Sequence, residues 1–403
     1  MRAFAMLVAV TALSQFHRSC LGVIAPELAR DLALSPEQLG QASGAFYLAL
    51  GLLQIPVGML FDRFGPRRTV TAFTAVAAAA AAWQSVAGTG AELIAARFLL
   101  GAGCAASIMG AVTLTAWWYA SERMSTMLSW VFALGQAGIF LAATPLALAS
   151  AAIGWRGAYA AMAAVTALAG VLFYLWVDDR RPRPAGAAEP FGAIVHGLLM
   201  VWRTRGLLPV LAIHTFAYAS MATVLGLWAG PFLADVYGLN GAARGNVLLA
   251  MAVAQCFGIL AYGPLDRVFN TRKWVIVGGA AGTVALLGVL ALWPRPPLAL
   301  AVTLLVLLCG VTAYAVVIVA HGRSLFADRL VGRGITTVNI AQVLGLTVLA
   351  LATGSIVDAF PAVAGGVARP ALAYRAAFGA IALALMAGLA VYLFARDSKP
   401  GTA

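Results

Sequence analysis

Arg18 lies near the middle of an apolar run at 3–29 and follows His17 directly. An arginine keeps its proton at physiological pH, so its charge needs an anion, hydrogen-bond acceptors or water around it. If the run spans a membrane, burying the charge costs ~2.5–3.5 kcal/mol. The long apolar runs carry no Asp or Glu near their centres. We therefore expect Arg18 to bind an anionic substrate, with backbone carbonyls or glutamine side chains as the structural alternative.

Two histidines in apolar runs are candidates for carrying a proton. Imidazole is the side chain whose ordinary pKa lies closest to physiological pH. His17 precedes the arginine, and His214 lies four residues before Tyr218, which places both on one face of a helix. A histidine that is simply packed inside a helix bundle is the alternative.

Uncharged polar residues near the middle of other runs are candidates to complete the binding site. Tyr47 and Gln54 are seven residues apart, so they share a helix face. Such residues more often form hydrogen bonds between membrane helices than contacts with a ligand. The remaining candidate substrate contacts are Gln136, Gln255, Tyr314, Asn339 and Gln342.

The elements that position these residues are membrane spans. Of the 403 residues, 63% are hydrophobic and 10% charged, whereas soluble domains are about half apolar and a quarter charged. The apolar runs predict an all-α membrane protein with twelve transmembrane helices, six on each side of a polar cytoplasmic linker at 178–205, which gives two six-helix bundles at 1–177 and 206–403. The predicted spans are 3–29, 36–61, 69–88, 91–117, 122–150, 154–177, 206–235, 241–268, 272–293, 297–325, 332–358 and 371–396.

The basic residues predict the orientation of these spans and argue against nucleic-acid binding. The net charge is +12, but the 26 Lys and Arg residues fall in short loops between apolar runs. Most of them belong to one side, which places both termini in the cytoplasm by the positive-inside rule. We expect a multi-pass protein of the cell (inner) membrane.

The two halves repeat a short loop. GMLFDRFGPRR at 58–68 is echoed by GPLDRVFNTRK at 263–273, so that Asp62 and Arg63 correspond to Asp266 and Arg267. Parallel repeats of this kind are a transporter architecture. Charge pairs at these helix ends can latch the halves in one state, whereas simple positive-inside anchoring is the alternative.

The first loop closely resembles the signature loop of the major facilitator superfamily, and the run RFLLGAG at 97–103 is similar to that superfamily's fourth-helix motif. The resemblance implies two pseudo-symmetric bundles of six helices around a cavity that opens alternately to either side, with no cofactor and a monomeric chain. The residues that it assigns to gating, together with the repeated pair, are Gly58, Asp62, Arg63, Gly65, Arg67, Arg68, Arg97, Asp266 and Arg267.

Residues 13–68 also resemble the anion:cation symporter branch of that superfamily, which carries organic acids with protons or sodium. In that branch Asp-Arg occupies the place of His17-Arg18, so this chain lacks the acidic residue. The resemblance implies uptake of a small organic anion coupled to a proton or sodium ion.

Two other cargo classes stay open. The superfamily includes importers of copper, vitamins and siderophores, and His196 and Met200 have a spacing that can bind Cu(I). Efflux of amphipathic compounds is the other class, although the fifth run lacks the Gly-Pro motif of drug antiporters, as it lacks the glycine-rich signature of nitrate porters. No enzyme motif is present: the sequence has no P-loop, metalloprotease pattern or nucleophile elbow.

Overall fold

The computed structural model describes residues 2–119, 121–178, 200–326, 331–363 and 366–400. Within these ranges the chain is helical and contains no strand. The predicted linker at 178–205 falls largely on 179–199, outside the described residues, as does His196. The division at 178–205 therefore stays a prediction.

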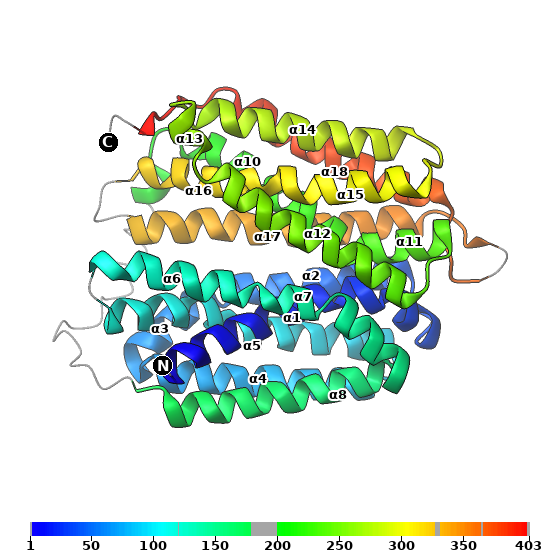
Figure 1. Ribbon diagram of the computed structural model, residues 1–403, viewed down its shortest axis with the longest axis horizontal. Coiled ribbons are helices and arrows are strands. Elements are labelled where there is room, and N and C mark those ends of the chain that lie inside the picture. Colours follow the sequence, from blue (N-terminus) through cyan, green and yellow to red (C-terminus); the bar gives the residue numbers. More distant parts are fainter. Residues whose placement is uncertain (1, 120, 179–199, 327–330, 364–365, 401–403) are drawn as a thin grey trace.

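The N-terminal half consists of helices that lie together in the lower part of Figure 1. Local signals set several of their ends: Ser35 and Gln38 form a capping box before Pro36, and Gly65, with φ of 80°, separates two helices. The helices are α1 (Arg2–Asp31), α2 (Pro36–Leu52), α3 (Gln54–Phe64), α4 (Pro66–Val86), α5 (Gly90–Trp118), α6 (Ser121–Gly135), α7 (Ala137–Leu141) and α8 (Thr144–Trp176).

The C-terminal half lies in the upper part of Figure 1 and contains two irregular turns inside its helices. These are the π-helical η1 (Val224–Trp228) and the 3-10 turn η2 (Thr312–Tyr314). The helices are α10 (Leu207–Thr223), α11 (Ala229–Tyr237), α12 (Gly241–Tyr262), α13 (Leu265–Val268), α14 (Lys273–Leu292), α15 (Leu298–Val311), α16 (Ala315–Ser324), α17 (Val331–Asp358) and α18 (Ala371–Tyr392).

The helices are long and apolar enough to cross a membrane many times. By length and composition, the described residues contain ten candidate spans, or eleven when α2 and α3, bent by 44°, are taken as one. One candidate, Thr126–Trp176, has 51 residues and breaks at Gly154, whose φ is 72°. At 1.5 Å per residue its length is ~76 Å, more than twice the ~30 Å of a bilayer core. The predicted number of twelve is reached only when this segment is taken as two passes.

Both termini lie on the left in Figure 1, and we call this side the terminal side and the opposite one the distal side. Buried apolar side chains of both halves join in one large cluster, which includes Ile24 and Leu233. Other clusters of described residues belong to one half only, for example those around Phe61 and around Ile318. The two halves therefore share a core on the distal side and have separate cores on the terminal side.

Candidate functional site

The distal contact between the halves is made by glycines. A Cβ on Gly22 of α1 would lie 2.7 Å from the Leu225 carbonyl oxygen in η1. One on Gly40 of α2 would lie 2.5 Å from the Ala350 carbonyl oxygen and 2.9 Å from the Gly354 Cα in α17. Real Cβ atoms do not approach so closely, so backbone meets backbone at these crossings. The distal side is closed in this structure.

Helices α2 and α17 diverge toward the terminal side. Gly51 still faces Val343, since a Cβ there would lie 2.9 Å from the valine Cγ1. Beyond Gly51 the chain bends by 44° between α2 and α3. Ile55 and Met59 lie four and eight residues after Gly51, on the same helix face, and both are exposed. On α17, Asn339 lies four residues before Val343 and is also exposed. The bend thus separates the helices and leaves Asn339 accessible.

Arg18 is half-buried and lies near the level at which the helices part. Its Nε is buried and makes no hydrogen bond. Both Arg18 and Tyr218 of α10 are electrostatic neighbours of the buried Tyr47 hydroxyl on α2. Arg18, Tyr47 and Tyr218, the last from the C-terminal half, therefore form one group, and its arginine lacks a carboxylate partner among the described residues.

His17 points away from this group, because successive residues of a helix differ by ~100° in direction. Its Nε2 lies 3.0 Å from the Thr166 hydroxyl of α8, and its side chain is buried inside the N-terminal half. The ring packs edge-on against Phe16. The structure therefore does not bring the two adjacent predicted residues, His17 and Arg18, into one contact.

Arg97 is fully buried in the N-terminal half, although the sequence places it with the gating residues. Its Nη1 donates to the His17 carbonyl oxygen at 2.8 Å, and its guanidinium carbon lies 4.7 Å from the centre of the Phe46 ring. A charge held in this way ties α5 to α1 and α2, which favours a structural role.

His214 is buried in the C-terminal half, and neither of its ring nitrogens makes a hydrogen bond. Gln342 of α17 is its polar neighbour. A buried imidazole without partners is costly, since each unsatisfied polar group loses its hydration. His214 and Gln342 thus form a second predicted pair that the fold brings together.

The other predicted contacts are dispersed. The Gln136 side chain accepts a hydrogen bond from Gln15 Nε2 at 2.8 Å. Gln15 lies one turn before Arg18 on α1 and was not among the predicted site residues. Tyr314 is buried against Gly279 in the core of the C-terminal half, away from the helices of the other half. Gln255 is buried on α12, and Gln54 is half-buried at the α2–α3 bend.

The repeated loops both lie on the terminal side. In the first, Asp62, Arg63 and Arg68 are exposed, whereas Arg67 donates from Nε to the Tyr174 carbonyl oxygen at 2.7 Å. Gly58 begins the last turns of α3, and Gly65 supplies the positive φ between α3 and α4.

In the second loop Asp266 is buried and accepts from Arg272 Nε at 3.2 Å, while Arg267 is exposed. The Asp397 carboxylate accepts from the backbone amides of Arg272 and Lys273, at 3.2 and 2.9 Å. The C-terminal segment therefore caps α14.

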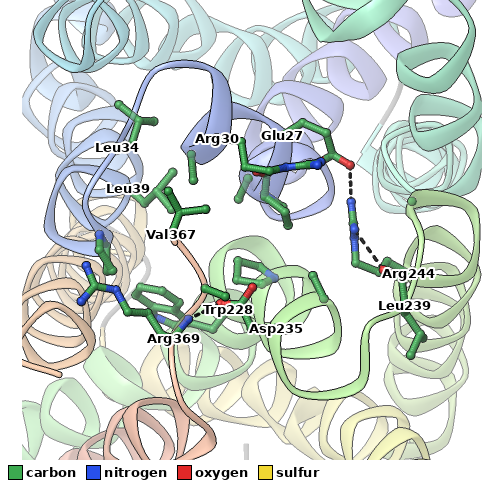
Figure 2. A pocket seen from close by; sticks show the side chains of 18 of the residues that line it. Glu27, Arg30, Leu34, Leu39, Trp228, Asp235, Leu239, Arg244, Val367 and Arg369 are labelled. Carbon is green, nitrogen blue, oxygen red and sulfur yellow. Dashed lines mark hydrogen bonds and ion pairs between the residues drawn. The ribbon is translucent and has the colours of Figure 1, made fainter. Parts of the chain in front are cut away.

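A cavity of about 460 Å³ lies on the distal side between the halves (Figure 2). Glu27 of α1 and Arg244 of α12 form an ion pair at its edge, and Asp235 and Arg369 also line it. The sequence did not single out these residues, because acids at span ends are common. Among the described residues, no group of three His, Cys, Asp or Glu side chains is placed to hold a metal ion.

The model of the Major Facilitator Superfamily matches residues 7–320 of this chain. The chain belongs to this superfamily. The similar curated proteins and solved structures are named as transporters, and the many long apolar helices make this chain a multi-pass membrane protein.

Three curated relatives are named as anion transporters. The nitrate/nitrite transporter of Nostoc punctiforme is 28% identical over 41% of this chain and 36% of its own length. The probable galactarate/D-glucarate transporter GudP of Escherichia coli is 30% identical over 31% of this chain and 29% of its own. The probable sulfoacetate transporter of Cupriavidus necator is 25% identical over 43% and 41%. The matched segment spans about two fifths or less of each relative.

Solved structures confirm the fold. A bacterial homologue of the human lysosomal transporter Spinster, in an inward-facing and occupied conformation, has a TM-score of 0.76 with 18% identity, covering 97% of this chain and 95% of its own. A D-xylose-proton symporter has a TM-score of 0.74 with 16% identity, covering 98% of both chains. At these identities the likeness concerns the fold alone.

Proposed function

We propose that this protein takes up a small organic anion, a carboxylate, by alternating access, in symport with a proton across the inner membrane. The observation that carries the proposal is Arg18, whose charge lies in the middle of a span without a carboxylate partner among the described residues and beside Tyr47 and Tyr218. A guanidinium binds a carboxylate through two parallel hydrogen bonds. Both tyrosine hydroxyls can donate to the same ligand.

The arrangement of the helices supports a binding site that faces the terminal side. The halves are in backbone contact on the distal side, and α2 and α17 diverge on the terminal side of Gly51. Arg18 lies near the level where these two helices separate. With both termini in the cytoplasm, as the basic loops predict, this state faces inward. The chain is proposed to act as a monomer, with one substrate site between its halves.

Proton coupling is proposed to involve a histidine. His214 is buried without hydrogen-bond partners near the centre of the C-terminal half, next to Gln342. His17 remains a candidate, although it is held by Thr166 inside the N-terminal half. A sodium ion is the alternative coupling ion.

An inorganic anion is the second candidate substrate, because the nitrate/nitrite transporter is 28% identical over 181 residues. Arg18 binds a planar oxyanion and a carboxylate by the same geometry. Copper import and efflux of amphipathic compounds have less support, because each of the three relatives described above is named for an anion.

The test is thermal unfolding of the purified protein with aldarates, simple carboxylates, sulfonates, nitrate, Cu(I) and neutral amphiphiles. A ligand at a hundred times its Kd stabilises by ~2.7 kcal/mol. We expect organic acids to raise the Tm of the wild type and of Arg203→Ala, whose arginine is exposed, but not of Arg18→Ala. Stabilisation by nitrate alone selects the second candidate. Stabilisation only by copper or amphiphiles contradicts both.

A further inference from the structure

The Glu27–Arg244 pair joins the two halves on the distal side. Glu27 lies one turn before the end of α1, and Arg244 lies in the first turn of α12. Arg244 Nη2 donates to Glu27 Oε1, and the two side chains are 5% and 24% exposed. Arg244 Nη1 also donates to the Leu239 carbonyl oxygen at 3.1 Å. The arginine is therefore anchored in its own half, and Glu27 supplies the bond to the other.

The pair also separates two cavities. Glu27, Asn240, Gly241 and Arg244 line both the distal cavity of about 460 Å³ and a neighbouring one of about 330 Å³. Figure 2 shows the Glu27 and Arg244 side chains meeting at the edge of the larger cavity. If the pair opens, the two spaces join, and water reaches the glycine contacts between α1 and η1.

The other charged groups around the pair are held within one half. Asp235 of α11 accepts from the Tyr374 hydroxyl at 2.6 Å and from the Arg369 backbone amide at 2.8 Å, and it acts electrostatically on Arg244. The Arg369 guanidinium pairs with Asp358.

In the N-terminal half, Asp31 accepts from Trp155 Nε1 at 2.7 Å and lies 3.8 Å from Arg156. Arg30 donates to the Pro26 carbonyl oxygen one turn earlier in α1. Of these carboxylates, Glu27 is the one whose ion pair crosses between the halves.

We propose that Glu27 is the proton-binding residue of a distal gate, so that protonation of its carboxylate from the distal side releases Arg244 and opens the protein there. Glu27 Oε2 is buried and makes no hydrogen bond, so a proton on it disrupts no other contact. Neutralising Glu27 leaves the nearly buried Arg244 charge without its partner, which is strongly unfavourable until water reaches it. Opening supplies that water. The proposal rests on the proton-coupled function above and gives the coupling a carboxylate in addition to His214.

The experiment measures distal opening without substrate. Ala25→Cys places a thiol in the distal cavity, at a position that is fully buried in this closed state, and Cys256→Ser removes the native thiol that is not buried. Proteoliposomes with the distal side outward are treated with a membrane-impermeant maleimide at pH 7.5 and at about pH 4, where a glutamate carboxylate ordinarily begins to bind a proton. The parent without Ala25→Cys gives the background.

At pH 7.5 we expect Glu27→Gln, which mimics the protonated acid, to react about tenfold faster than the wild type. At about pH 4 the two rates approach each other, because the wild-type carboxylate then binds a proton. Comparing the two proteins at one pH cancels the intrinsic pH dependence of the thiol. Arg244→Gln reacts fast at both pH values. The exchange Glu27→Arg with Arg244→Glu restores a slow rate at pH 7.5, which shows that loss of the pair, and not misfolding, opens the gate.

Two outcomes overturn the proposal: a Glu27→Gln rate equal to that of the wild type at pH 7.5, or a ratio of the two rates that is the same at both pH values. Loss of the pH dependence in Asp235→Asn instead assigns the proton to Asp235 and also overturns it. The readout needs no anion, so a failure of Arg18 to bind carboxylates leaves the result for Glu27 unaffected.

Discussion

Gly40→Ala is expected to shift the balance between distal-closed and distal-open states without unfolding the protein. The added Cβ would lie 2.5 Å from the Ala350 carbonyl oxygen and 2.9 Å from the Gly354 Cα, both in the other half. Overpacking of this kind costs ~1–3 kcal/mol. The cost arises only while α2 and α17 are in contact, so it falls on the closed state alone.

The magnitude follows from separating two effects. Alanine stabilises a helix by up to ~1 kcal/mol relative to glycine, but it does so equally in both states, so this gain cancels in the equilibrium between them. A net penalty of ~2 kcal/mol on the closed state changes that equilibrium about thirtyfold. We therefore expect the Ala25→Cys thiol to react with the impermeant maleimide many times faster in Gly40→Ala than in the parent.

Two matched variants separate this effect from ordinary destabilisation. In Gly103→Ala the new Cβ would lie 2.4 Å from the Ala77 backbone nitrogen, within the N-terminal half, so we expect a lower Tm and no change in labelling. In Gly278→Ala no atom lies within 4 Å, so both the Tm and labelling stay at or above parent values. If Gly40→Ala lowers the Tm as Gly103→Ala does and leaves the labelling rate unchanged, the contact is not specific to one state and the reasoning fails.

Three further predictions concern single side chains. Burial raises the pKa of Asp397, but hydrogen bonds from Thr271 and two backbone amides outweigh this effect and hold the pKa below the usual aspartate value. The carboxylate therefore stabilises the fold fully above the usual pKa, and this stabilisation is lost as the pH falls through the lowered pKa of the folded protein. Asp397→Asn should therefore cost ~0.5–1 kcal/mol at pH 7, and its Tm should approach that of the wild type near pH 3. Thr166→Val leaves the His17 Nε2 unpaired and should lower the free energy of unfolding by ~1–3 kcal/mol in a denaturant titration, unlike Thr166→Ser. His214→Gln should change the Tm little, because the glutamine amide is also polar and lies beside Gln342, while substrate uptake loses its stimulation by acid. Unchanged stimulation would remove His214 from coupling.

The fold was predictable because its signals are local. Apolar runs, broken by charges, Pro and Gly, gave bounds close to those of many helices, and the structure shows local signals at the same places, such as the Ser35 cap and Gly65. A break between the fifth and sixth spans was predicted at 151–153, and the chain turns next to it, at Gly154. The bend between α2 and α3 was not predicted, since 36–61 reads as one apolar run.

The candidate site was predictable only in part, because apolar spacing does not tell which face of a helix meets the other half. Arg18, Tyr47 and Tyr218 come together as expected from their depth in the spans. His17 is adjacent to Arg18 in sequence, yet one residue of helix turns it toward Thr166. Tyr314 has the same depth as a substrate contact, but its ring packs on Gly279 inside one half.

Glu27 shows a further reason why depth alone misleads. A carboxylate near the end of a span reads as an ordinary interfacial group, and only the fold shows that Arg244, 217 residues later in the chain, supplies its partner from the other half. A residue that carries a coupling proton need not lie at the substrate, because the proton has to bias the same equilibrium between two states that the substrate biases. An ion pair that forms only in the distal-closed state biases this equilibrium wherever it lies along the membrane span. That Arg18 has no acid beside it in the described part of the chain is therefore compatible with proton coupling.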